Sequence, residues 1–119
     1  MRVDIDIVQG QDGDGVILPL ADAGGTPIAE DPTGWECYST IKSRGYPVMT
    51  RDSRVDPATA TVITHEGALA VRLLWSREDT VEWKFEKGKW DIWVVNPEGE
   101  HYKVGEGDVF VDLRVSDAN

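Results

Sequence analysis

The stretch "GKWDIWVVNPEGE", residues 88–100, decides the fold because it joins a strictly alternating run to a turn. The two alternating sets are Trp90, Ile92 and Val94, and Asp91, Trp93 and Val95. Successive side chains of a β-strand point to opposite faces, so the run predicts a half-buried strand with Trp90 inward and Trp93 outward. Residues 96–99, Asn-Pro-Glu-Gly, have the proline and glycine positions of a β-turn, which predicts a hairpin to the run "EHYKV".

The same period of two recurs along the rest of the chain. It predicts strands over residues 3–7, 16–20, 35–42, 59–65, 68–75 and 108–116, with a short hairpin region at 43–58. In the strand at 35–42, the side with Trp35, Cys37, Ser39 and Ile41 is expected to face the core. The other two long runs each align four apolar residues on one side: Leu69, Val71, Leu73 and Trp75; Val109, Val111, Leu113 and Val115. Pro19 favours an edge position or a bulge for its strand, whereas the apolar run at 68–75 favours a central strand.

A single helical turn is predicted near residues 76–82. Ser76 is followed three residues later by Asp79, which is the spacing of a capping box. About eight or nine short strands with almost no helix are typical of a β-sandwich or barrel. We therefore expect one all-β domain over residues 1–119, with residues 1–10 as a first strand, arm or edge strand and 116–119 as a flexible end.

Charge and composition exclude several classes of function. Twelve basic residues against 22 acidic ones give a formal charge of −10, which disfavours nucleic acid as a partner. The N-terminal run "MRVDIDIVQG" has no continuous apolar stretch, so we expect neither a signal peptide nor a membrane anchor, and synthesis in a cytoplasm. Cys37 is the only cysteine, which excludes an internal disulfide and a multi-cysteine zinc site.

Candidate catalytic and metal-binding groups are few. The run "QDGDG", residues 11–15, has two closely spaced carboxylates, but a calcium loop also needs a closing glutamate, so a tight turn is the better interpretation. His65 and His101 match no metal-ligand spacing, and Cys37 lies on an apolar face beside groups that would not activate a thiol. We therefore expect no enzyme activity, no cofactor and no metal.

Aromatic residues on outward faces are the remaining functional signal. Trp93, Tyr102, Trp83 and Phe110 are the candidate interface residues, since exposed aromatic rings form interface hot spots or stack on sugars. The alternative for Trp93 is that it covers the second face of its own sheet. Trp83 has a second interpretation as well, because it lies close to Phe85 and could fasten the short helical turn.

The spacing of Glu86, Gly88 and Trp90 resembles the corner that precedes the penultimate hairpin of immunoglobulin-like sandwiches. Ile92 then stands where antibody domains carry a cysteine, and Trp90 where they carry the corner tyrosine. The resemblance implies that Trp35 is the buried core tryptophan. It makes Trp35, Cys37, Gly88, Trp90 and Ile92 the fold-determining residues.

A second resemblance extends over nearly the whole chain. Its motifs are Gln9-Gly10, Asp31-Pro32-Thr33-Gly34, Ser76 with Asp79-Thr80, Gly88-Lys89-Trp90-Asp91-Ile92, and the run from Gly107 to Val115. In this pattern the chain resembles small immunoglobulin-like minor tail, tail-tip and baseplate-upper proteins of tailed bacteriophages. It departs from them at Pro32, which replaces an aliphatic residue, and at Trp90 and Trp93, which replace tyrosine or polar residues.

The resemblance implies a non-enzymatic assembly subunit of a virion tail tip or baseplate. Its expected partners are other virion proteins and further copies of the same chain, without nucleic acid or membrane. Two alternatives stay open: a carbohydrate-binding module in which Trp93 and Tyr102 stack on a host-wall glycan, and a head-decoration or head-fibre subunit of the same fold.

Overall fold

The computed structural model describes residues 2–10, 14–22 and 24–113. Its elements are β1 (Ile5–Val8), β2 (Asp14–Pro19), β3 (Glu36–Ser43), β4 (Tyr46–Asp52), β5 (Ala60–His65), β6 (Ala68–Trp75), α1 (Arg77–Thr80), β7 (Lys87–Val95) and β8 (His101–Asp112). The predicted all-β class with one helical turn after Ser76 is confirmed. The expected flexible end at 116–119 lies outside the described residues, as does Val115.

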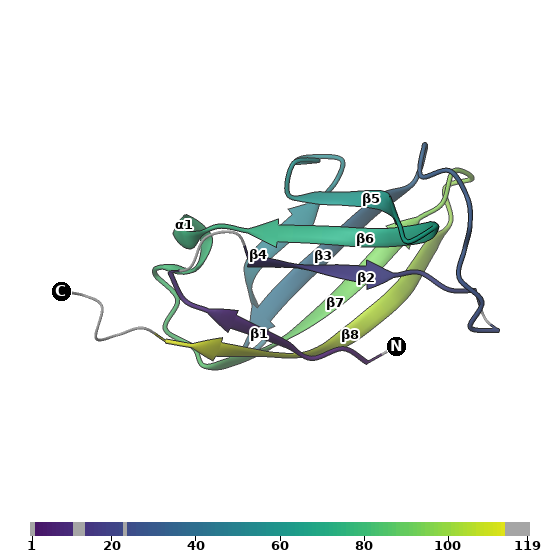
Figure 1. Ribbon diagram of the computed structural model, residues 1–119. Coiled ribbons are helices and arrows are strands. Elements are labelled where there is room, and N and C mark those ends of the chain that lie inside the picture. Colours follow the sequence, from purple (N-terminus) through teal and green to yellow (C-terminus); the bar gives the residue numbers. More distant parts are fainter. Residues whose placement is uncertain (1, 11–13, 23, 114–119) are drawn as a thin grey trace.

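Two sheets form the layers of a β-sandwich (Figure 1). The larger sheet has the order β1-β8-β7-β3-β4 and the smaller has the order β2-β6-β5. Strand β1 runs parallel to β8, and every other pairing is antiparallel. This arrangement is consistent with an immunoglobulin-like sandwich. The sheet order also confirms β6 as central and β2, the strand with Pro19, as an edge.

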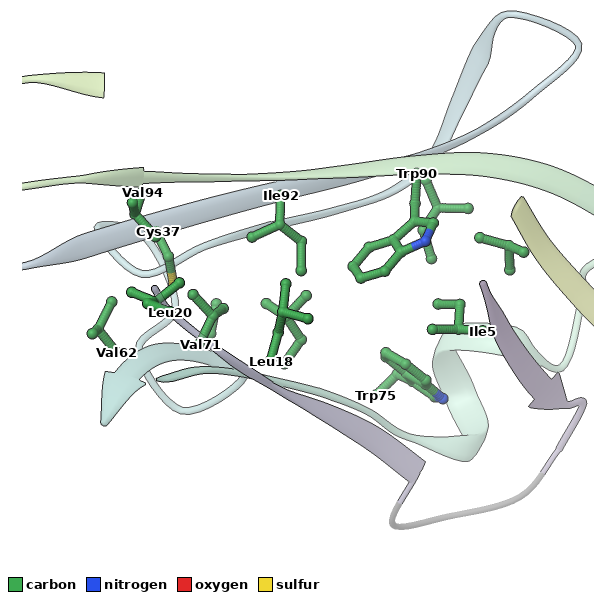
Figure 2. Packing of buried hydrophobic residues seen from close by; sticks show 14 of the residues in the cluster. Ile5, Leu18, Leu20, Cys37, Val62, Val71, Trp75, Trp90, Ile92 and Val94 are labelled. Atoms are coloured by element: carbon green, nitrogen blue, oxygen red, sulfur yellow. The ribbon is translucent and has the colours of Figure 1, made fainter. Parts of the chain in front are cut away.

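The core lies between the sheets and follows the predicted alternation. On β7, Trp90, Ile92 and Val94 are all at most 3% exposed, and on β3 the same holds for Cys37, Ser39 and Ile41. Figure 2 shows Trp90 pointing from β7 toward Trp75 and Ile5. Burying side chains of this size stabilises the fold by about 1.5–3 kcal/mol each. The alternation at residues 89–95 is therefore the pattern of a strand that supplies the middle of the core.

Trp35 does not occupy the place expected for it. It precedes β3 and is only partly buried at the rim of the core. The tryptophans between the sheets are Trp75 and Trp90, at 5% and 3% exposure. The prediction for Trp35 was wrong because the strand begins one residue later, so Cys37 is the first β3 side chain that reaches the interior.

The two strands predicted after residue 100 are one continuous strand, β8. A register shift opposite Ile92 and Trp93 absorbs the change in alternation, and Gly105 and Gly107 continue the ladder without side chains. A Cβ at Gly107 would collide with the carbonyl oxygen of Val3, which crosses directly over it. Because glycine has no side chain, the chain before β1 can lie directly against β8 at this position.

Two motifs far apart in the sequence form a single corner between the sheets. The Gln9 side-chain amide is within hydrogen-bond distance of the carbonyl oxygens of Thr80 (3.0 Å), Val81 (3.1 Å) and Trp83 (2.6 Å). Gly10, with φ of 76°, donates its N–H to Thr80 Oγ1 at 3.0 Å. The Gln-Gly motif after β1 therefore bonds to carbonyl groups at the end of α1 and in the segment that follows it, where backbone acceptors are no longer paired in a regular helix.

The remaining motifs are turns and close approaches. The Asp31 carboxylate accepts hydrogen bonds from the N–H and hydroxyl of Thr33, which lowers the pKa of Asp31 from its ordinary value, and Gly34 follows at φ of 85°. A Cβ at Gly88 would lie 2.6 Å from the Lys42 carbonyl oxygen. These residues specify the fold, and none of them builds a cleft.

Candidate assembly surface

Strands β3 and β7 bring Tyr38 and Trp93 together on the outer face of the larger sheet. The two residues are cross-strand partners, with ring centroids 6.1 Å apart and planes 1° from parallel. Both are half-buried. Stacked rings of this kind contribute about 0.5–1.5 kcal/mol beyond the area they bury. The predicted outward direction of Trp93 is confirmed. The ring that stacks on it belongs to Tyr38, on the adjacent strand of the same sheet.

A basic and a polar group hold the Tyr38 ring on its other sides. The Arg54 guanidinium lies 5.1 Å from the ring centroid, and it forms two 2.9 Å hydrogen bonds with the Asp52 carboxylate. This pairing lowers the pKa of Asp52 and raises the pKa of Arg54. The Tyr38 hydroxyl lies 3.1 Å from Nδ1 of His101 on β8. The aromatic pair is thus pre-ordered, which reduces the entropy cost of binding a partner there.

Tyr102 lies on the opposite face from Trp93. In the β7–β8 register Trp93 pairs with Lys103, whereas Tyr102 pairs with the inward-facing Val94. Tyr102 instead lines an open, mainly apolar groove of about 530 Å³ with Leu20 and Trp35. Trp93 and Tyr102 therefore form no common platform, and the sugar-stacking pair expected from the sequence is not present.

The other two candidate interface residues also lie apart. Trp83 is partly buried against the core, with its ring centroid 4.9 Å from that of Phe85, as expected for a residue that fastens the corner after α1. Phe110 is 39% exposed and lies below Lys87, whose Nζ is 5.7 Å from the ring centroid. Of the four residues, only Trp93 belongs to an outward aromatic cluster.

The described residues contain neither a reactive cysteine nor a group of side chains that could bind a metal ion. Cys37 is fully buried, and burial raises the pKa of its thiol to about 11. At neutral pH it is therefore protonated, as the prediction of a core cysteine requires. No group of three or more His, Cys, Asp or Glu in the described ranges could hold a metal ion. Residues 11–13 of the calcium-loop-like run lie outside those ranges.

Tyr38 and Arg54 are the surface residues that sequence reasoning missed. Tyr38 was assigned to the outer face of its strand, but nothing in the sequence indicated that it would pair with Trp93, which lies more than fifty positions away. Arg54 lies in the predicted hairpin region, just after β4, where the sequence shows no regular alternation. The sequence did contain one signal for Arg54, an aspartate two positions before it in a turn. Such an aspartate often bonds to the backbone two residues later, and Asp52 accepts the Arg54 backbone N–H at 2.9 Å.

Comparison with known proteins adds no family. No protein-family model matches the sequence, and no curated protein matches it significantly. In the part of the chain that the structure describes, no helix is long and apolar enough to span a membrane.

Proposed function

We propose that this chain is a non-enzymatic assembly subunit that binds its partners through the outer face of the larger sheet. The observation that carries the proposal is the Tyr38–Trp93 stack, a pre-ordered aromatic pair on a sheet face. Tryptophan and tyrosine are the residues that most often dominate protein interfaces. Arg54 adds a third hot-spot residue type to the same cluster.

We further propose that the assembly is the tail tip or baseplate of a bacteriophage. Support for this location is the sequence resemblance described above, together with the positions of its motifs. Gln9-Gly10, Asp31-x-Thr33-Gly34, Ser76-x-x-Asp79-Thr80, Gly88 and Gly107 all lie at turns, at the α1 corner or at close backbone approaches. A family that keeps a scaffold and varies its outer faces would retain such residues.

Immunogold labelling of intact particles tests the location. Antibodies against this chain should label tail tips or baseplates of a phage that encodes it. Labelling of the head would instead favour the head-decoration or head-fibre alternative. Particles that carry no label, although the protein is synthesised during infection, would contradict a virion role altogether.

Substitution of Trp93 tests the surface. Trp93→Ala should weaken incorporation into the assembly while the chain stays folded, since Trp93 lies outside the core. Phe110→Ala is a matched control, because Phe110 is also an outward aromatic on the larger sheet but lies apart from Tyr38. Equal incorporation of Trp93→Ala and wild type would contradict the proposed surface.

One observation favours the carbohydrate-binding alternative. The parallel rings of Tyr38 and Trp93 would suit the faces of adjacent sugar units, in place of the Trp93–Tyr102 pair. Titration with host-wall glycans, followed by tryptophan fluorescence, would detect such binding. An unchanged spectrum at millimolar glycan excludes this alternative and leaves the assembly proposal standing.

A further inference from the structure

The outer face of the smaller sheet is unusually apolar for so acidic a chain. Its strand residues lie in cross-strand rows of Ile17, Arg72 and Thr61, of Pro19, Ala70 and Ile63, of Gly15 and Leu74, and of Ala68 and His65. Ile17 is 42% exposed. None of these strand residues carries a carboxylate, although the chain has 22 acidic residues. Exposed apolar side chains on a face without carboxylates favour an interaction site there.

Arg72 lies at the centre of this face without an anionic partner. No described carboxylate forms an ion pair with it, and its Nε atom is buried without a hydrogen-bond acceptor. A donor enclosed by neighbouring side chains and left unpaired costs free energy, more so when it carries charge. The face is therefore suited to a surface that is apolar and brings one carboxylate to Arg72.

The outer face of the larger sheet carries several charged residues along β7 and β8, but it offers apolar rings and a carboxylate side by side at Trp93 and Asp91. Asp91 lies two residues from Trp93 on the same side of β7, and no described basic group forms an ion pair with it. The nearby carboxylates of Asp52 and Glu106 are paired with Arg54 and Lys103. Asp91 beside the Tyr38–Trp93 stack thus offers Arg72 a carboxylate next to two aromatic rings.

We propose that the Arg72 face of one copy docks on the Trp93 face of a second copy, with Arg72 against Asp91. The inference rests on the proposed assembly function and supplies the second half of its contact surface. The two faces lie on opposite sides of the sandwich (Figure 1), so the contact is head-to-tail and generates a ring or a filament. A two-fold contact between two Arg72 faces would instead oppose like charges.

Sedimentation of purified protein over a concentration series tests the contact. Wild type should associate, and Arg72→Glu or Asp91→Arg should each weaken association at least tenfold, since each opposes like charges at the centre of the contact. Lys84→Glu is the control for charge reversal, because Lys84 is exposed on the segment before β7. Circular dichroism establishes that each variant is folded.

An equimolar mixture of the two variants is the decisive sample. Arg72→Glu keeps an intact Trp93 face and Asp91→Arg keeps an intact Arg72 face, and the two altered side chains are themselves opposite in charge. The mixture should therefore associate although neither variant does so alone. A monomeric wild type at millimolar concentration, an Arg72→Glu variant that associates as wild type does, or a mixture that stays monomeric would each overturn the inference. A monomeric protein that still labels phage tails would refute this contact but not the proposed function.

Discussion

The indole Nε1 of Trp90 donates a hydrogen bond of 2.7 Å to the carbonyl oxygen of Val3. The bond joins the middle of the core to the chain before β1, and the same carbonyl passes directly over Gly107 on β8. The N–H of Val3 donates to Glu106 at 2.8 Å. Trp90 therefore both fills the space between the sheets and fixes the parallel edge strand. The corner tyrosine of immunoglobulin-like domains likewise bonds to backbone, through its hydroxyl.

Trp90→Phe should separate these two roles. Phenylalanine keeps most of the buried ring but leaves the Val3 carbonyl without its donor, so we expect the free energy of unfolding to fall by about 1–3 kcal/mol. Urea unfolding followed by far-ultraviolet circular dichroism measures the loss. Trp93→Phe is the matched control and should cost under about 1 kcal/mol, since its indole N–H makes no described hydrogen bond. Equal losses for the two variants would show that the bond to Val3 contributes nothing.

Gly107→Ala should destabilise the pairing of β1 with β8. The added Cβ has no room beneath the Val3 carbonyl, so the chain before β1 must move outward and lose the bond from Trp90. We expect a cost of about 1–3 kcal/mol, the range for overpacking a close contact. Gly24→Ala, where the nearest atom lies 3.4 Å from the added carbon, should cost far less. Faster amide hydrogen exchange at Ile5 and Ile7 in Gly107→Ala, but not in Gly24→Ala, would show that the pairing of β1 with β8 is weakened.

Local alternation was enough to predict most strands and the inward side of β7. Trp90 and Ile92 sit in a run whose polar and apolar positions are unambiguous, so the pattern determined their burial. The position of Trp35 was mistaken because alternation alone does not fix where a strand begins. Trp75, the other central tryptophan, lay in a run where both faces are largely apolar, and the sequence did not distinguish it.

Contacts across strands could not be predicted in the same way. The partnership of Tyr38 with Trp93 depends on the register between β3 and β7, which a single sequence does not contain. A bulge opposite Trp93 then placed Tyr102 on the inner face, against the expectation that both rings point outward. The isolation of Arg72 likewise follows from which strands flank β6, a matter of topology.

Asp79→Ala should loosen the corner that carries α1. The Asp79 carboxylate accepts the Ser76 backbone N–H at 2.7 Å and pairs with Arg51 Nη2 at 2.6 Å. Arg51 is only 13% exposed, and its Nε donates to the Leu74 carbonyl oxygen. Removing the carboxylate leaves a partly buried guanidinium without its anion, for which we expect a loss of about 1–3 kcal/mol.

Glu78→Ala is the control for Asp79→Ala. Glu78 occupies the same helical turn but is exposed, so its removal should change the free energy of unfolding by no more than about 0.5 kcal/mol. Thermal unfolding of both variants in the same buffer makes the comparison. If the two variants unfold together, the capping box and the Arg51 pair do not stabilise this corner.

Cys37 should make the protein lose stability at alkaline pH. The pKa of its buried thiol is raised to about 11, whereas an unfolded thiol ionises near its ordinary pKa of 9.0. Between these values the unfolded state has released the proton and the folded state has not, so the free energy of unfolding falls as pH rises through this window. Two pKa units correspond to about 2.7 kcal/mol. The loss of stability is therefore zero below pH 9 and reaches this full amount only near pH 11.

Cys37→Ala tests this pH dependence. The variant should be less stable than wild type at pH 7 because of the cavity it leaves, yet its stability should decline less steeply from pH 9 to 11. Urea unfolding at several pH values measures both slopes, and parallel slopes for wild type and variant would mean that the thiol is not protected from ionisation by burial.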